Sequence, residues 1–154
     1  MVQIEKRLSD MGLELPDAPA PVANYIPAYR AGNLVFLSGV GPRDYDGNTL
    51  KGKVGKDVSV EDAYQASRMC ALNLLANLRG LIGDLDKVKH IVKLLGMVNG
   101  ESDFTDQPAV INGCSELLVE LFEEKGRHAR SAVGMGSLPG GMAVEIEMIV
   151  EVED

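Results

Sequence analysis

Arg130 is the residue of this sequence best suited to hold a small anion. Its planar fork of N–H donors fits a carboxylate through two parallel hydrogen bonds. The surrounding segment alternates like a strand, so Ala132 and Gly134 share the face of Arg130 and leave space beside it. A fixed cation with room next to it predicts a binding site for a small carboxylic acid.

Glu145 is the second candidate for chemistry and lies 15 residues after Arg130. The connection between the two segments is short enough for a hairpin, so we expect Glu145 on the strand adjoining Arg130. A cross-strand ion pair of Arg130 with Glu145 or Glu147 on a solvated face is the plainer interpretation, and periodicity leaves both open.

Other residues that could do chemistry have weaker patterns. His90 and His128 match no metal-ligand spacing, and Cys70 and Cys114 lie in apolar helical patterns, where a cysteine is usually buried and inert. The glycines at 134–141 precede a strand pattern, whereas a dinucleotide loop must open a helix. We expect no metal and no cofactor.

The composition limits the class of protein. The 154 residues are 45% hydrophobic and carry a net charge of −8, which suits one globular domain and disfavours a nucleic acid as partner. No stretch reaches the roughly 18 apolar residues of a membrane span, and the first ten residues are too charged for a signal peptide. With two cysteines and no disulfide framework, a reducing cytoplasm is the expected location.

Two amphipathic helices stand out in the middle of the chain. The first is expected over 59–83, with Ser59 and Asp62 resembling a capping box. The second begins near Asp106 and Pro108 and stops at Gly126. Each has one apolar stripe, so together they cover one face of a sheet, and the other face must meet water or another subunit.

The strands are expected around these helices, at 34–38, 88–98, 129–135 and 142–152. The first, an apolar run between glycines, is typical of a strand buried on both faces. In the last, Val144, Ile146 and Met148 should face the helices and Glu145 the opposite side. The order predicts an α+β domain with a mixed sheet over 22–154. Before it lie a short helix at 3–12 and a proline-rich lead-in, which make up 1–21. Residues 41–58 are expected to form a surface loop or a loose hairpin.

Four segments together resemble a known family. HARSAV at 128–133, SLP at 137–139 and AVEIE at 143–147 resemble the closing signature of the RidA (YjgF/YER057c/UK114) family, and GNLVFLSG at 32–39 resembles its early strand. The resemblance covers about residues 22–152, and the longer N-terminus is similar to a divergent endoribonuclease L-PSP or chorismate-mutase-like branch. It implies a single-domain chorismate-mutase-like (YjgF) fold and a homotrimer around a β-barrel core, with ligand clefts between subunits.

The same resemblance implies hydrolysis of reactive enamines and imines, such as 2-aminoacrylate, to a keto acid and ammonia without a cofactor. Arg130 would bind the substrate carboxylate, and Glu145 would position or activate water. The remaining residues that the resemblance assigns to substrate binding are Tyr25, Gly39, Asn112 and Ala132, the last in place of a cysteine often found there.

Three other functions stay open from the sequence. The same pocket could serve a noncatalytic protein that binds small carboxylic acids. An endoribonuclease or translation inhibitor is suggested by the family label but opposed by the charge of −8. Chorismate rearrangement would rest on fold resemblance alone. The expected partners are a keto or imino acid and further copies of the chain, with no membrane and no nucleic acid.

Overall fold

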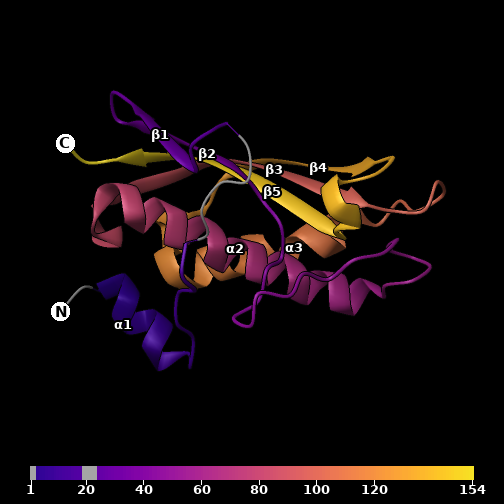
Figure 1. Cartoon of the computed structure of the whole chain (residues 1–154). Helices are drawn as coiled ribbons and strands as arrows, with labels where there is room; N and C mark the ends of the chain where they lie inside the picture. Colours follow the sequence, from indigo (N-terminus) through magenta and orange to yellow (C-terminus); the bar gives the residue numbers. More distant parts are fainter. Residues whose placement is uncertain (1–2, 19–23) are drawn as a thin grey trace.

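The computed structural model describes residues 3–18 and 24–154 of the chain. One mixed five-stranded sheet, in the order β1-β2-β5-β3-β4, lies over a layer of helices (Figure 1). The α+β class and a sheet covered on one face are therefore confirmed. The elements are α1 (Gln3–Asp10), β1 (Ala28–Ala31), β2 (Leu34–Val40), α2 (Val60–Ile82), η1 (Leu85–Lys87), β3 (Val88–Asn99), α3 (Gln107–Phe122), η2 (Glu123–Gly126), β4 (Ala129–Met135), η3 (Pro139–Gly141) and β5 (Val144–Val152).

Helix α2 begins and ends where the sequence predicted. The Ser59 hydroxyl accepts a hydrogen bond from the Asp62 amide at 3.1 Å and so satisfies one of the free N–H groups of the first turn. At the other end Gly83 has a φ of 81°, and its N–H donates to the Arg79 carbonyl. The apolar stripe between them is buried from Ala63 to Leu78, whereas Leu81 in the last turn is 44% exposed.

Helix α3 is shorter than predicted, because its last turn tightens. It ends at Phe122, and the single 3-10 turn η2 carries the chain on to Gly126. A Cβ at Gly126 would come within 2.3 Å of the Leu118 carbonyl oxygen, so only glycine fits this close against the helix. The backbones of α2 and α3 also approach closely, since a Cβ at Gly113 would lie 2.1 Å from the Tyr64 carbonyl oxygen.

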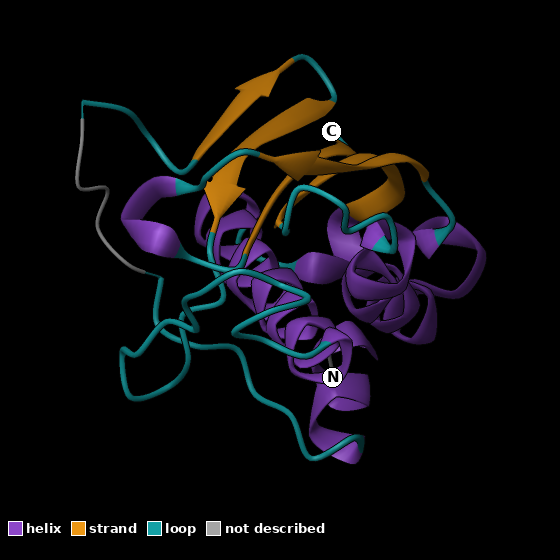
Figure 2. Ribbon diagram, turned by 90° about the vertical axis from the view of Figure 1, so that its right-hand side faces the viewer, coloured by secondary structure: helices purple, strands orange, loops and turns teal. Residues whose placement is uncertain are grey.

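The two faces of the sheet differ as the last strand predicted. Val144, Ile146 and Met148 of β5 are buried against the helices, and the residues between them point to the other face. In the described part of the chain both long helices lie on one side, and no element covers the opposite side (Figure 2). We call that side the open face.

The predicted hairpin between the last two strands is wrong. Strand β3 lies between β4 and β5 and pairs parallel with β4 and antiparallel with β5. Parallel strands require a crossover, and α3 provides it between β3 and β4. The connection after β4 is long enough to pass over β3, because two strand spacings are only about 10 Å. Glu145 is therefore not on the strand adjoining Arg130.

The edge formed by β1 and β2 also departs from the prediction. The sequence did not predict β1, which pairs antiparallel with β2. Strand β2 is buried on one face only, because Val35 and Leu37 lie under the sheet while the Phe36 side chain is 43% exposed on the open face. Apolar side chains thus occupy both faces of β2, although the helices cover only one.

The N-terminal helix packs on the same core. Ile4 and Leu8 of α1 are buried, and the Asp86 carboxylate accepts hydrogen bonds from the Gln3 and Ile4 amides at 2.7 and 3.0 Å. Arg7 donates to the Leu121 carbonyl. The predicted boundary between 1–21 and 22–154 falls outside the described residues, and the predicted loop at 41–58 is irregular with isolated bridges.

None of the helices in the described part of the chain is long and apolar enough to cross a membrane.

Candidate functional site

Arg130 lies on β4 at the edge of the sheet and points to the helix-covered side. Its register partner on β3 is Leu94, which in turn pairs with the buried Met148 of β5, so all three share that side. The half-buried guanidinium donates from Nη1 to the Ser115 hydroxyl at 3.1 Å. Among residues 3–18 and 24–154, no carboxylate forms a salt bridge with Arg130. A cation without a counter-charge remains able to bind an anion.

Small and polar groups surround Arg130 on the same side of the sheet. Ala132 and Gly134 follow it on β4, and a Cβ at Gly134 would lie 2.9 Å from the Gln107 side-chain nitrogen. Helix α3 therefore runs antiparallel to β4, with Gln107 level with Gly134 and Ser115 level with Arg130. Asn112, one turn before Ser115, then lies near the level of Ala132.

We call Arg130, Ala132, Asn112 and Ser115 the arginine half-site. Arg130 and Ala132 share a face of β4, Asn112 lies on the helix beside that face, and Ser115, which the sequence analysis missed, contacts Arg130 directly. Ser115 carries no signal in the sequence, because it is a single polar residue within an apolar helical pattern.

Glu145 lies on β5 and points to the open face. It pairs with Met97 of β3, which pairs with Val133 of β4, so this row alternates with the row of Arg130. Burial, and then the neighbouring Glu147, raises the pKa of the Glu145 carboxyl. A Cβ at Gly39 of β2 would lie 3.1 Å from the Glu145 Cδ, so the absence of a side chain at Gly39 makes room for this carboxylate.

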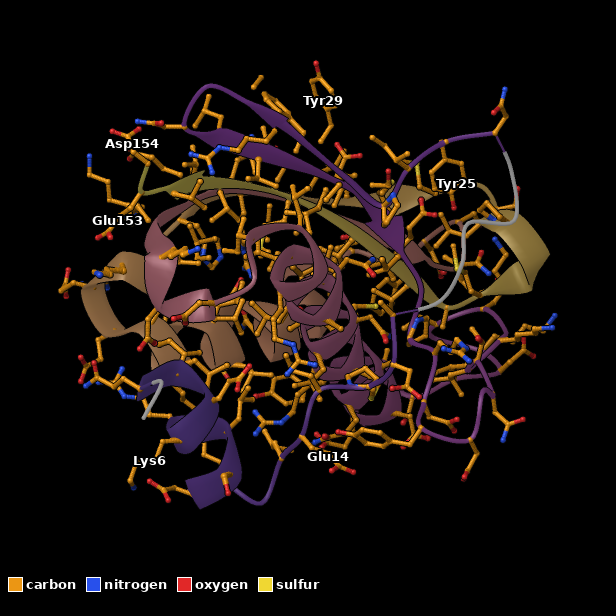
Figure 3. The ribbon with its side chains drawn as sticks, turned by 60° about the vertical axis from the view of Figure 1, so that its left-hand side comes forward. Lys6, Glu14, Tyr25, Tyr29, Glu153 and Asp154 are labelled. Carbon is orange, nitrogen blue, oxygen red and sulfur yellow. The ribbon has the colours of Figure 1, made fainter. Side chains whose placement is uncertain are left out.

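Tyr25 is found on the open-face side of the β1–β2 edge, before β1 begins. It is 48% exposed, and Figure 3 shows it in the loop that leads into β1. The chain next to it is held to β2, because the Ser38 hydroxyl donates to the Ile26 carbonyl at 2.7 Å. A shallow depression here is lined by Tyr25, Ile26, Tyr29, Phe36, Leu37 and Ser38. We call Glu145, Gly39 and Tyr25 the glutamate half-site.

The two half-sites lie on opposite faces of the sheet within one protomer. Arg130 is in the row of Met148 and faces the helices, whereas Glu145, three residues earlier on β5, faces away from them. The ion pair of Arg130 with Glu145 or Glu147 is therefore wrong, since strand β3 separates the two strands and the side chains face apart. One chain alone does not bring Arg130 and Glu145 together.

The structure also describes the two cysteines and the metal-ligating residue types that the sequence analysis set aside. Both free cysteines are buried, and burial raises the pKa of the Cys114 thiol to about 12 and that of Cys70 well above its usual value. Neither is a ready nucleophile. Within 3–18 and 24–154, no group of three or more His, Cys, Asp or Glu side chains is arranged to hold a metal ion.

Comparison with known proteins gives a consistent family. A family model described as "YjgF/chorismate_mutase-like, putative endoribonuclease" matches residues 5–148. Protein TCP17 of Trypanosoma cruzi is 39% identical over 99% of this chain and 96% of its own length. A 2-iminobutanoate/2-iminopropanoate deaminase of Dermatophagoides farinae is 29% identical over 92% of this chain and 95% of its own length. The crystal structure of Atu1372 from Agrobacterium tumefaciens, a protein of unknown function, has a TM-score of 0.90 and 44% identity, covering 97% of this chain and 92% of that one.

Proposed function

The chain belongs to the YjgF/chorismate-mutase-like family, and we propose that it hydrolyses reactive enamine or imine acids of the 2-aminoacrylate type to a keto acid and ammonia. The reaction takes place in a cleft that two protomers of a homotrimer form together. One protomer supplies the arginine half-site and the next supplies the glutamate half-site. The relative from Dermatophagoides farinae, which is named for the deamination of such imines, supports this substrate class.

The observation that carries the proposal is the uncompensated charge of Arg130. In the described part of the chain, Nη1 of Arg130 donates to the neutral Ser115 hydroxyl, so the other N–H donors of the guanidinium remain for a ligand. A carboxylate that docks there in the bidentate geometry gains two charge-assisted hydrogen bonds. Ala132 and Gly134 leave the space that the substrate needs beside the cation.

Glu145 supplies the acid–base chemistry. An enamine acid first tautomerises to the imine, and the Glu145 carboxylate takes a proton from a water molecule whose oxygen bonds to the imine carbon. That proton passes to the nitrogen, which gives a carbinolamine. Glu145 then moves the hydroxyl proton of the carbinolamine to the nitrogen, the carbon–nitrogen bond breaks, and the products are a carbonyl and ammonia. A raised pKa suits this exchange, because a base works best when its pKa is near the working pH. The step needs no cofactor.

The open face supports the proposed assembly. Leu34 and Phe36 of β2, Tyr29 of β1 and Val133 of β4 expose apolar side chains on the face that the helices leave free, and Tyr29 projects from the sheet in Figure 3. Apolar surface of this kind is typical of contacts between subunits. A trimer that closes around this face would cover it and bring β4 of one protomer to the β1–β2 edge of the next.

A role as an endoribonuclease is not favoured by the charge of the chain. At −8 per chain, a trimer repels the phosphate backbone that such an enzyme must hold. We propose the cytoplasm as the location, because the buried thiols of Cys70 and Cys114 are free and unpaired.

The experiment is to generate 2-aminoacrylate in situ with a PLP-dependent dehydratase and to follow ammonia and pyruvate with and without this protein. We expect the protein to accelerate their release above the rate of spontaneous hydrolysis. Acceleration must disappear in Arg130→Ala, checked for folding by circular dichroism. An unchanged rate with the folded wild type contradicts the proposal, and pyruvate binding without turnover would instead identify a noncatalytic binder.

A further inference from the structure

The guanidinium of Arg130 is the end of a chain of hydrogen bonds, and no carboxylate of residues 3–18 or 24–154 pairs with it. Arg130 Nη1 donates to the Ser115 hydroxyl, which lies 2.8 Å from Nε2 of His128. The other ring nitrogen of His128, Nδ1, lies 2.7 Å from the carbonyl oxygen of Gly126. The chain therefore runs from the end of η2 through a histidine and a serine to the arginine at the sheet edge.

The chemistry of these groups fixes the direction of every bond. A carbonyl oxygen only accepts, so Nδ1 of His128 carries the proton and donates to Gly126. In the neutral ring Nε2 is then the acceptor, and the Ser115 hydroxyl must donate to it. The guanidinium only donates, so Ser115 accepts from Arg130 through an oxygen lone pair. Each donor in the chain has one acceptor.

The surroundings favour the neutral ring that this arrangement needs. Burial lowers the pKa of His128, and the nearby positive charge of Arg130 and the ring of His90 lower it further, although the Gly126 carbonyl acts in the opposite direction. Nε2 of His90 is itself hydrogen-bonded to the Arg127 carbonyl at 2.6 Å. At neutral pH His128 is uncharged and can accept from Ser115.

The chain is also held firmly at its far end. Gly126 lies so close to the backbone of α3 that no side chain fits there, so the residue that carries the accepting carbonyl packs directly on the helix. Ser115 is on α3, and Gly126 of η2 packs against the same helix, so α3 holds both partners of His128. A long side chain such as Arg130 loses rotamer freedom when it binds a ligand, and a fixed partner reduces that loss.

We infer that Ser115 and His128 are positioning residues that orient the Arg130 guanidinium for the carboxylate of its ligand. Neither touches the reacting atoms. The inference rests on the proposed function for the identity of the ligand, but the hydrogen-bond chain itself is independent of any activity. His128 acts through the acceptor at Nε2, and Ser115 acts through its hydroxyl.

Binding and turnover test the effect on Arg130. For Ser115→Ala we expect KM for the imino acid and Kd for pyruvate to rise roughly tenfold to a hundredfold, the loss typical of a hydrogen bond to a charged group, with little change in kcat. Ser115→Thr keeps the hydroxyl and should restore binding. Wild-type KM and Kd in Ser115→Ala would overturn the inference.

A matched pair at His128 separates positioning from packing. His128→Gln places an amide oxygen near the position of Nε2 and keeps an acceptor for Ser115, whereas His128→Asn keeps a polar group near Nδ1 only. We expect His128→Gln to bind pyruvate more tightly than His128→Asn at equal thermal stability. Equal weakening in both variants would mean that the ring only fills space.

A spectroscopic measurement tests the chain without any ligand. The ring nitrogen chemical shifts of His128 in the wild type should report the Nδ1–H tautomer at neutral pH, with a pKa that rises in Arg130→Ala. An Nε2–H tautomer overturns the inference whether or not the protein is a deaminase. Another outcome is that the tautomer is as expected while the wild type neither binds pyruvate nor releases it. In that case the proposed function is wrong, and the positioning role is wrong with it, because Arg130 then binds no carboxylate.

Discussion

Arg130 and Glu145 lie on opposite faces of the same sheet, with strand β3 between the strands that carry them. Arg130 faces the helices and is hydrogen-bonded to Ser115, whereas Glu145 faces the side that the helices leave open. The two residues assigned to one reaction therefore cannot meet within a protomer. This relationship makes a site shared between protomers the arrangement that lets both residues act on one substrate.

Replacement of Arg130 tests the carboxylate clamp. Arg130→Lys keeps the charge but removes the fork of donors, so we expect a loss of about 2–5 kcal/mol of transition-state binding. This loss corresponds to a fall in kcat/KM of roughly 30-fold to several thousandfold. The control is Arg127→Lys, an arginine whose exposed side chain pairs with Glu124 at 3.6 Å. A surface pair of this kind is worth about 0–1 kcal/mol. Wild-type kcat/KM in Arg130→Lys and Arg130→Ala would refute the clamp.

Replacement of Glu145 tests the general base. Glu145→Gln keeps the size of the side chain but cannot take a proton from water, so kcat should fall about 10²- to 10⁴-fold while pyruvate still binds. Glu151→Gln is the matched control, because Glu151 lies on the same strand and face and forms a pair with Lys89. If Glu145→Gln turns over substrate at the wild-type rate, another group handles the water.

The raised pKa of Glu145 also predicts an effect on stability. The folded state binds the proton of this carboxyl more tightly than the unfolded chain, in which the carboxyl has its ordinary pKa of 4.5. The protonated carboxyl therefore stabilises the folded state relative to the ionised one. This stabilisation is complete below pH 4.5 and is lost as the pH rises through the pKa of the folded state. Glu145→Gln should therefore raise Tm relative to wild type at about pH 7 and lose that advantage at about pH 4. Circular dichroism melts at both pH values check this, and a lower Tm at about pH 7 would show that the ionised carboxylate stabilises the fold.

Gly39 predicts a change in the site without a change in the fold. The Cβ of Gly39→Ala would press against Glu145 at 3.1 Å, so the carboxylate must move by a few tenths of an ångström. Such a displacement should lower kcat by between about threefold and about a hundredfold. Gly80→Ala is the control, since a Cβ at Gly80 meets nothing within 4 Å and should stabilise α2 by about 0.5–1 kcal/mol. If Gly39→Ala has wild-type kcat, Gly39 does not set the position of Glu145.

Much of the fold could be predicted from the sequence because local patterns determine it. The capping of α2 by Ser59 and the alternation of β5 depend on neighbouring residues alone, and both were predicted. The order of strands in the sheet depends instead on contacts between segments that are far apart in the sequence. A short connection is compatible with a hairpin and equally with a path over one intervening strand, so the sequence could not show that β3 separates β4 from β5.

The candidate site could be predicted only residue by residue. The register of β4 bears out the prediction that Arg130, Ala132 and Gly134 share one face. Their relation to Glu145 was wrong, because it depended on the order of strands. Ser115 was missed, since a polar residue in an apolar helix gains meaning only when the helix is packed against β4. Strand β1 was missed because Ala28–Ala31 is four residues long and mostly exposed.

Mixed trimers test most directly the claim that two protomers share the site. Arg130→Ala and Glu145→Gln chains, each expected to be inactive when it assembles alone, are to be unfolded together in equal amounts and refolded. If each site takes its arginine from one protomer and its glutamate from the next, about one site in four regains both wild-type residues, and activity should return to about a quarter of wild type. If the site lies within one protomer, no site has both residues and the mixture stays inactive, which would contradict the account.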